Sequence, residues 1–189
     1  MQEISKIVTI GPESTGKSSL CKSLALNYGG LWCPEYARQY LMEDGTDYTF
    51  DNLLTIAKGQ ARLEEEYTPK AIEHWQANGR KTAKPLLFLD TDMYVMKVWC
   101  EYVFGKCHQY ILDKIVEDKR DLYLLCNIDL PWVKDELREY PDLKTREELF
   151  YIYKDILINQ QVPWVDVKGT GEERLLNTIV AIDKHLNPQ

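Results

Sequence analysis

The chain has 189 residues, which is enough for a single domain with a sizeable core. It carries 30 acidic and 23 basic residues and a net charge of −7 at pH 7, so it would repel a nucleic-acid backbone. No apolar run reaches the roughly 18 residues that a membrane-spanning helix needs, and the N-terminus lacks the basic and apolar regions of a signal peptide. We therefore expect one globular domain over residues 1–189, whose partner is a small molecule and neither nucleic acid nor a membrane.

The cysteines indicate the compartment. There are five, an odd number, and none forms a C-x-x-C pair. This pattern favours reduced thiols and predicts a cytoplasmic location. Cys107 and His108 lie close to Cys100, but no second pair follows at zinc-ligand spacing, so no zinc site is predicted.

The first predicted elements surround a glycine-rich loop. Residues 4–10 form a predicted buried strand, and residues 19–26 have the apolar spacing of a helix. Between them, Gly-Pro-Glu-Ser-Thr-Gly-Lys-Ser at 11–18 matches the phosphate-loop pattern G-x-x-x-x-G-K-[ST] at every fixed position. Such a loop turns backbone N–H groups toward a triphosphate at a helix N-terminus. We expect ATP there, with Lys17 bridging the β- and γ-phosphates and Ser18 holding Mg²⁺. The predicted ATP-binding residues of the loop are Gly11, Ser14, Thr15, Gly16, Lys17, Ser18 and Ser19.

A second predicted strand, residues 31–33, ends at Pro34, and a helix is predicted over residues 35–41. Glu35 and Arg38 are three residues apart and share a face of that helix. Ligands of open α/β sheets bind at the carboxyl ends of the strands, so this pair is expected at a substrate. The alternative is a local salt bridge on a surface helix.

Residues 51–78 have a helical pattern with Asp51 as a plausible N-cap. Pro69 is expected to divide this stretch into two helices. Gln60 could reach a ligand, but polar residues on a helix are usually only solvated.

A continuous apolar run at residues 85–89 predicts a strand of the parallel-sheet type, followed by Asp90-Thr91-Asp92 and a helix over 93–104. Asp90 is the predicted support for Mg²⁺, often through water. Asp92 has two interpretations of equal weight: it activates an acceptor hydroxyl, or it caps the following helix.

The fourth predicted strand, residues 122–126, leads into a segment with several basic residues. Pro131 suits the first turn of a helix there, on which Asp135 and Arg138 lie three residues apart. A mobile helix pair at about 129–147 would form a phosphotransferase lid that lays Arg138 on the transferring phosphate. An ordinary charged surface helix is the alternative.

Two more helices, at residues 147–159 and 172–186, flank a strand at 163–167. Gly169, in the glycine turn after this strand, is expected either beside an adenine ring or in a tight turn without a ligand. Strands alternate with helices along the whole chain, which predicts an α/β fold with a parallel, doubly wound sheet.

Four motifs together identify a protein family much more specifically than the phosphate loop does alone. They are residues 11–18, Glu35-Tyr36-Ala37-Arg38, Leu89-Asp90-Thr91-Asp92, and Asp129-x-Pro-Trp-x-x-Asp-x-x-Arg ending at Arg138. With them the chain resembles, over nearly its whole length, the ribosylnicotinamide kinase domain of the multifunctional bacterial NAD-biosynthesis regulators. The resemblance implies a P-loop NTPase fold of five parallel strands with a helical lid. It also implies ATP-dependent phosphorylation of the 5′-hydroxyl of nicotinamide riboside.

On this hypothesis Lys17 and Arg138 neutralise charge on the transferred phosphoryl group, and either Glu35 or Asp92 takes the ribose proton. An aromatic side chain would face the cationic nicotinamide ring. The candidates for substrate contact are Glu35, Tyr36, Arg38, Trp99, Trp132 and Asp135.

The larger members of that family carry an upstream adenylyltransferase domain and in some cases a DNA-binding domain. Because the first predicted strand begins almost at Met1, we expect this chain neither to make NAD by itself nor to bind an operator. Two rival functions remain: a kinase for another nucleoside or nucleotide, and an ATP-hydrolysing switch module that exchanges partners.

Overall fold

A computed structural model describes residues 2–186 and contains an open sheet of five parallel strands. The order across the sheet is β2-β3-β1-β4-β5. The strands are β1 (Ser5–Ile10), β2 (Leu31–Cys33), β3 (Leu86–Leu89), β4 (Leu122–Cys126) and β5 (Trp164–Val167). The predicted five-stranded parallel α/β fold is confirmed.

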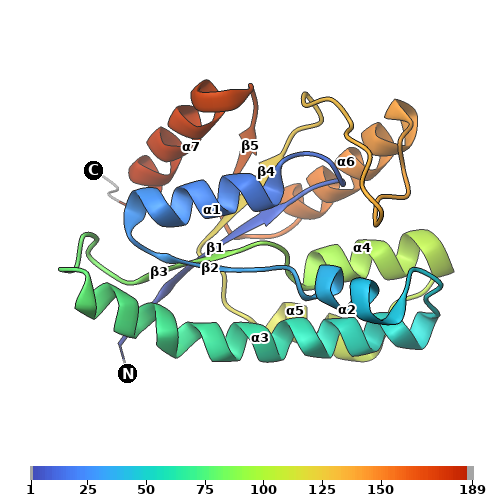
Figure 1. Cartoon of the computed structure of the whole chain (residues 1–189), viewed down its shortest axis with the longest axis horizontal. Helices are drawn as coiled ribbons and strands as arrows, with labels where there is room; N and C mark the ends of the chain where they lie inside the picture. Colours follow the sequence, from blue (N-terminus) through green and yellow to red (C-terminus); the bar gives the residue numbers. More distant parts are fainter. Residues whose placement is uncertain (1, 187–189) are drawn as a thin grey trace.

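Helices cover both faces of this sheet. Figure 1 shows α1 and α7 together on one side and the long α3 along the opposite side. Strand residues alternate between two cores: Ile7 and Phe88 pack with α1 and α7, whereas Val8 and Leu89 pack with α4 and α6. The strands are therefore nearly continuous apolar runs. The helices are α1 (Lys17–Tyr28), α2 (Tyr36–Asp44), α3 (Phe50–Ala77), α4 (Met93–Phe104), α5 (Gln109–Glu117), α6 (Leu143–Ile158) and α7 (Gly171–Leu186).

The strand order places the site. Central β1 pairs with β3 on one side and β4 on the other, so the loops after β1 and β3 leave the same edge of the sheet next to each other. In open α/β sheets, ligands bind in the crevice where the strand order reverses.

None of the helices within residues 2–186 combines the length and the apolar character that membrane crossing requires.

Helix α3 differs from its prediction at two points. It is one helix of 28 residues that contains Pro69, and its N-cap is Thr49 and not Asp51. A proline costs about 3 kcal/mol inside a helix. Beyond it, however, Ala71 and Trp75 are both buried, and their packing holds the second half of the helix in line.

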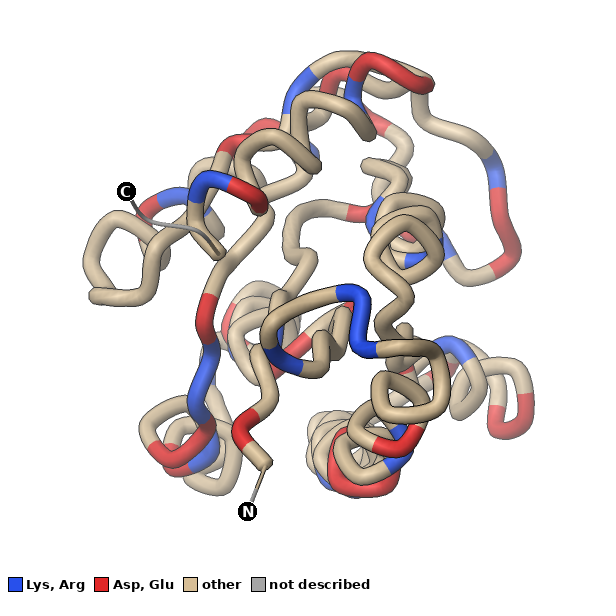
Figure 2. Tube along the Cα trace, turned by 90° about the vertical axis from the view of Figure 1, so that its left-hand side faces the viewer, with Lys and Arg blue, Asp and Glu red and all other residues tan. Residues whose placement is uncertain are grey.

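The predicted lid helix beginning at Pro131 is wrong. Residues 127–142 form turns and irregular backbone between β4 and α6. The reason is that backbone N–H groups on which a helix here would depend bond to side chains of the phosphate loop: Val133 donates to Ser14, and Glu139 donates to Glu13. The Arg138 N–H bonds to the Asp135 carbonyl at 3.2 Å, which closes a single turn. Acidic and basic positions are intermingled along the whole trace (Figure 2).

Candidate active site

The phosphate loop is shaped by three residues in left-handed or similar backbone conformations. Gly11 has φ of 136°, Ser14 of 58° and Gly16 of 75°. A Cβ at Gly11 would lie 2.7 Å from the carbonyl oxygen of Cys126, so only glycine lets the loop pass this close to the end of β4. Gly16 is the N-cap of α1, and the loop therefore presents the helix N-terminus to the space in front of it.

Lys17 lies inside the curl of this loop. Its ammonium donates hydrogen bonds to the carbonyl oxygens of Gly11 and Pro12 at 2.9 and 2.8 Å. The Thr15 hydroxyl donates to the same Pro12 oxygen at 2.7 Å and closes the loop from the other side. A cation and a helix N-terminus thus face one spot, which is the arrangement that binds phosphate.

A cavity of about 260 Å³ opens from this loop toward an apolar wall. The loop residues Gly11 to Ser19 form one end. Side chains from α2, α4, α6 and the segment after β4 form the other end, and Glu35 lies in the lining with both groups. The charged and aromatic side chains of the lining outside the loop include Glu35, Arg38, Trp99, Tyr102, Arg138, Tyr140 and Tyr153.

Glu35 is the N-cap residue of α2, yet its side chain makes no capping hydrogen bond. Its carboxyl group is therefore available to the cavity. Burial raises its pKa to about 7, against the opposing influence of the Lys17 charge. A carboxyl group that titrates near neutral pH is well matched to proton transfer at that pH.

Asp90, at the carboxyl end of β3, is 2% exposed. Its Oδ1 has no hydrogen-bond partner among the described residues, although burial leaves it out of reach of bulk water. Burial raises the Asp90 pKa, while the Ser18 hydroxyl and the Lys17 charge lower it. A buried carboxylate oxygen without a donor, close to a hydroxyl, is the type of oxygen set that suits Mg²⁺.

Asp92 points elsewhere. Its Oδ1 accepts a hydrogen bond from the Tyr94 N–H at 2.9 Å, which caps α4, and its Oδ2 accepts one from the Tyr123 hydroxyl at 2.8 Å. Arg120 Nε lies 3.7 Å from the same Oδ2. Asp92 is absent from the cavity lining, so of its two predicted roles the geometry matches the cap and not the base.

The segment 127–142 is folded over the phosphate loop. The Glu13 carboxylate accepts hydrogen bonds from the N–H groups of Glu139, at 3.0 Å, and Tyr140. The Ser14 hydroxyl accepts one from Val133 at 2.9 Å. The loop motif leaves position 13 open, and only the tertiary contact identifies Glu13 as a site residue.

Both predicted arginines lie at this cover. Arg138 lines the cavity, and its guanidinium donates to the carbonyl of Val133 in its own segment. Arg38 forms a two-pronged ion pair with Asp135 at 3.0 and 3.3 Å, which joins α2 to the segment 127–142 across the cavity. The alternative of a local salt bridge between Glu35 and Arg38 is therefore wrong, because the ion-pair partner of Arg38 is Asp135, which is distant in sequence.

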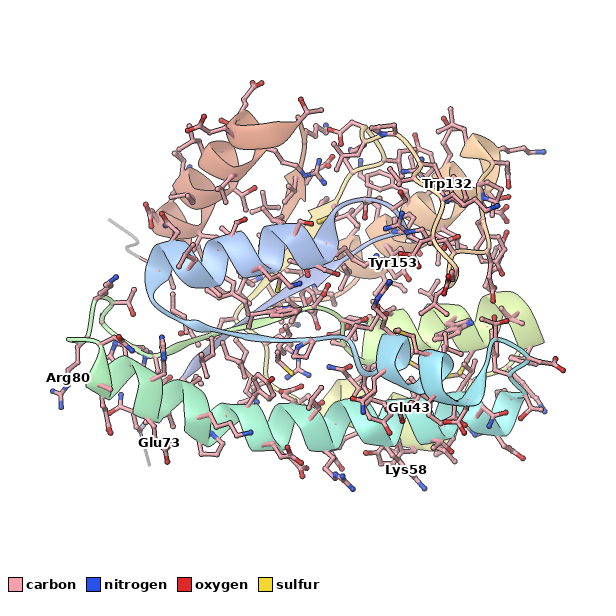
Figure 3. The ribbon with its side chains drawn as sticks, in the orientation of Figure 1. Glu43, Lys58, Glu73, Arg80, Trp132 and Tyr153 are labelled. Carbon is pink, nitrogen blue, oxygen red and sulfur yellow. The ribbon has the colours of Figure 1, made fainter. Side chains whose placement is uncertain are left out.

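The predicted aromatic and adenine contacts divide into two groups. Trp99 lines the cavity, and its indole N–H donates to the Tyr48 hydroxyl at 2.8 Å. Tyr36, Trp132 and Gly169 are not in the lining. Figure 3 shows Trp132 out in the segment after β4, apart from Tyr153, and the Gly169 N–H donates to Asp129 at 2.6 Å.

Several functional candidates escaped the sequence analysis. Tyr140 and Tyr153 line the cavity, but as aromatic residues in a loop and on an amphipathic helix they give no distinctive sequence signal. Gln60, expected to be solvated, is 1% exposed and bonds to the backbone on both sides of Glu35.

Comparison with known proteins agrees with this geometry. The family model described as AAA domain matches residues 6–174. The trifunctional NAD biosynthesis/regulator protein NadR of Escherichia coli (strain K12) is 26% identical over 188 residues, covering 97% of this chain but 43% of NadR, so the chain spans less than half of that relative.

Two solved NadR structures share the fold. A complex with NR matches with a TM-score of 0.75 at 20% identity, over 98% of this chain and 50% of that chain. A complex with NAD and AMP-PNP matches with a TM-score of 0.63 at 20% identity and the same coverage. The predicted likeness to the multifunctional NAD-biosynthesis regulators is confirmed, and the chain belongs to the AAA domain family.

Proposed function

We propose that the chain is an ATP-dependent kinase that phosphorylates the 5′-hydroxyl of nicotinamide riboside to give nicotinamide mononucleotide. One observation carries this proposal: a single cavity joins the phosphate loop to an apolar, aromatic wall, with the Glu35 carboxyl group in its lining. A phosphate cradle, an acceptor pocket and a proton acceptor in one cavity are the parts that phosphoryl transfer to an alcohol requires. The NR complex of the structurally similar NadR supports the choice of acceptor.

The loop would hold the triphosphate. Backbone N–H groups of the curled loop and the Lys17 ammonium face the same spot, and Lys17 would exchange its loop carbonyls for phosphate oxygens when ATP arrives. The AMP-PNP complex of NadR supports ATP as the donor. Ser18 and Asp90 would hold Mg²⁺, which when bound neutralises charge on the phosphates.

The acceptor end would hold the nucleoside. Trp99, Tyr102 and Tyr153 line this end, and their rings would attract a flat, positively charged pyridinium. The 5′-oxygen would attack the γ-phosphorus, the bond from that phosphorus to the β–γ bridging oxygen would break, and ADP would leave. Glu35 would take the hydroxyl proton, and Arg138 would move from the Val133 carbonyl to the transferring group.

The test is a panel assay of ADP formation against nucleosides. The proposal predicts ADP release that depends on nicotinamide riboside, with release in its absence slower by about two orders of magnitude or more. Faster turnover with another nucleoside would favour the rival kinase. ADP release that is indifferent to every acceptor would favour the switch module and remove the kinase proposal.

A further inference from the structure

The residue before α2 is held in place by the neighbouring helix α3. Gln60 of α3 reaches the backbone on both sides of Glu35: its Oε1 accepts a hydrogen bond from the Tyr36 N–H at 2.7 Å, and its Nε2 donates to the Pro34 carbonyl at 3.3 Å. Gln60 is 1% exposed. Its side-chain amide therefore bonds to the backbone of this turn and not to solvent.

One of these bonds satisfies a backbone N–H group at the start of α2. The first N–H groups of a helix have no partner within it, and the N-cap side chain usually accepts from one of them. At α2 the N-cap is Glu35, whose side chain makes no such bond. Gln60 accepts from the first N–H of α2, that of Tyr36, and so fixes the backbone where the Glu35 side chain departs, while the Glu35 carboxyl group, which caps nothing, lies in the cavity lining.

A neighbouring glycine makes the close approach possible. A Cβ at Gly59 would lie 2.1 Å from a ring carbon of Tyr36, so the bare backbone of α3 is what the Tyr36 ring packs against. Tyr36 is thus fixed on one side by its ring and on the other by its N–H. This contact also explains why Tyr36, a predicted substrate contact, faces α3.

We propose that Gln60 is the positioning residue for Glu35: it fixes the backbone on either side of the proposed base and leaves its carboxyl group directed at the acceptor hydroxyl. This inference rests on the proposed function for its kinetic consequence, but its structural part stands on the two hydrogen bonds alone. Small displacements of a reacting group are costly, since a shift of about 1 Å can lower a rate by about 10²-fold.

Other charged groups act on Glu35, and Gln60 is not one of them. A neutral amide can orient the carboxyl group without changing the net charge around it. The charged or titratable groups that interact with Glu35 are Lys17 and Glu13 from the phosphate loop, Arg38 from α2, Asp90 after β3, and Tyr153 from α6.

The kinetic test is a double-mutant cycle between Gln60 and Glu35. Gln60→Met keeps the length of the side chain and removes both hydrogen bonds, so kcat with nicotinamide riboside should fall by about tenfold or more with the KM for ATP unchanged. Glu35→Gln should lower kcat by about 10²-fold. If Gln60 acts through Glu35, the double variant should be no slower than Glu35→Gln alone. Effects that multiply in the double variant, or an unchanged kcat in Gln60→Met, would overturn the proposal.

Trp75→Phe is the matched control. Trp75 lies on the same helix, is 7% exposed, and donates one side-chain hydrogen bond to a backbone carbonyl, that of Thr82 at 2.9 Å. Its loss should lower thermal stability without coupling to Glu35→Gln. Should Gln60→Met fail to fold, Gln60→Glu serves in its place, because it keeps the acceptor for the Tyr36 N–H. It should be slowed less than Glu35→Gln, again without an additive effect in the double variant.

Hydrogen exchange separates this inference from the proposed function. In Gln60→Met the Tyr36 amide should exchange at least about tenfold faster than in the wild type, and in Trp75→Phe it should not. If the wild type has no riboside-dependent activity, the proposed function falls, and the exchange result alone decides the positioning. Unchanged protection of the Tyr36 amide would overturn the positioning role whatever the activity.

Discussion

The two sides of the cavity are held in different ways. On the Glu35 side, the contacts are buried: Gln60 is 1% exposed and Asp90 is 2% exposed. On the side of the segment 127–142, the start is anchored by the buried Arg174 and Arg146, which bond to Asp129 and Leu130. The ties of the later part, residues 133–139, are near the surface, and in the Arg38–Asp135 pair the side chains are 55% and 21% exposed. Surface ion pairs contribute little free energy, about 0–1 kcal/mol, whereas a buried polar group that loses its partner costs about 1–3 kcal/mol. From this difference we expect the Glu35 side to act as a fixed wall and the later part of the segment 127–142 to act as a cover that opens to admit substrate.

The largest effect should come from the fixed side. Lys17→Ala removes the only lysine of the cavity lining and should abolish phosphoryl transfer. The fold should survive, because the bonds of the Lys17 ammonium run to two carbonyls of its own loop and not to the sheet core. Kinetics together with circular dichroism check both halves, and near-normal turnover would remove the phosphate-loop assignment.

Arg138→Ala tests the cover. Because an arginine that closes on the transferring group acts in the transition state, kcat should fall by about 10³-fold, with a much smaller change in ATP affinity. Single-turnover kinetics and ATP titration measure the two quantities. Weaker ATP binding with kcat unchanged would make Arg138 an ordinary nucleotide contact and would remove its role in the cover.

The two carboxylates considered as the base should respond differently to the loss of their charge. Glu35→Gln should lower kcat by about 10²-fold, and it should raise thermal stability near neutral pH because it removes a buried charge. Asp92→Asn should mainly lower stability, because it disturbs the cap of α4 and the bond from Tyr123. Thermal melts and kinetics of both variants make the comparison, and a large fall in kcat for Asp92→Asn alone would reverse the assignment of the base.

The pH dependence should follow Glu35. Because its pKa is raised to about 7, Glu35 loses its ionised form below that pH, so kcat/KM should rise from about pH 6 toward pH 8. This rise of kcat/KM with pH should be absent in Glu35→Gln. For stability the sign is opposite. The raised pKa means that the folded protein binds the proton more tightly than the unfolded chain, so ionisation of Glu35 lowers stability as pH rises from about 4.5 toward about 7. Rate profiles and melts from pH 5 to about 8.5 test both, and a wild-type limb shared by Glu35→Gln would assign it to another group.

The smallest effect should come from the surface tie. Arg38→Ala and Asp135→Ala should each cost about 1 kcal/mol or less in stability and change kcat by less than about threefold. High salt should reduce even this difference, because it screens the exposed pair. Denaturant melts at two salt concentrations measure it. A loss of activity in Arg38→Ala as large as that in Arg138→Ala would place Arg38 on the substrate after all.

Local signals explain what the sequence predicted well. The phosphate loop, the strands and the Asp90 position each depend on a contiguous pattern, and the glycines and apolar runs that shape them are visible in it. The errors concern contacts between distant residues. Pro69 does not break α3 because packing beyond it outweighs its cost. The segment 127–142 is not helical because Glu13 and Ser14 take the N–H groups of residues 133, 139 and 140.

Gln60 is the clearest case of this kind. From the sequence, a glutamine on a helix is expected to be solvated. The structure places Gln60 beside Glu35, which lies 25 residues earlier in the chain. The sequence also left open whether Glu35 or Asp92 is the base, and burial together with specific hydrogen-bond partners is what favours Glu35 in our proposal. Neither quantity is visible in spacing alone.

The most direct test follows the phosphoryl group itself. Wild-type protein is supplied with Mg²⁺, ATP labelled at the γ-phosphate, and either nicotinamide riboside or its 5′-deoxy analogue. The account predicts label in nicotinamide mononucleotide with the riboside and almost none transferred to the 5′-deoxy analogue. Label released only as inorganic phosphate, at the same rate with and without riboside, would contradict it.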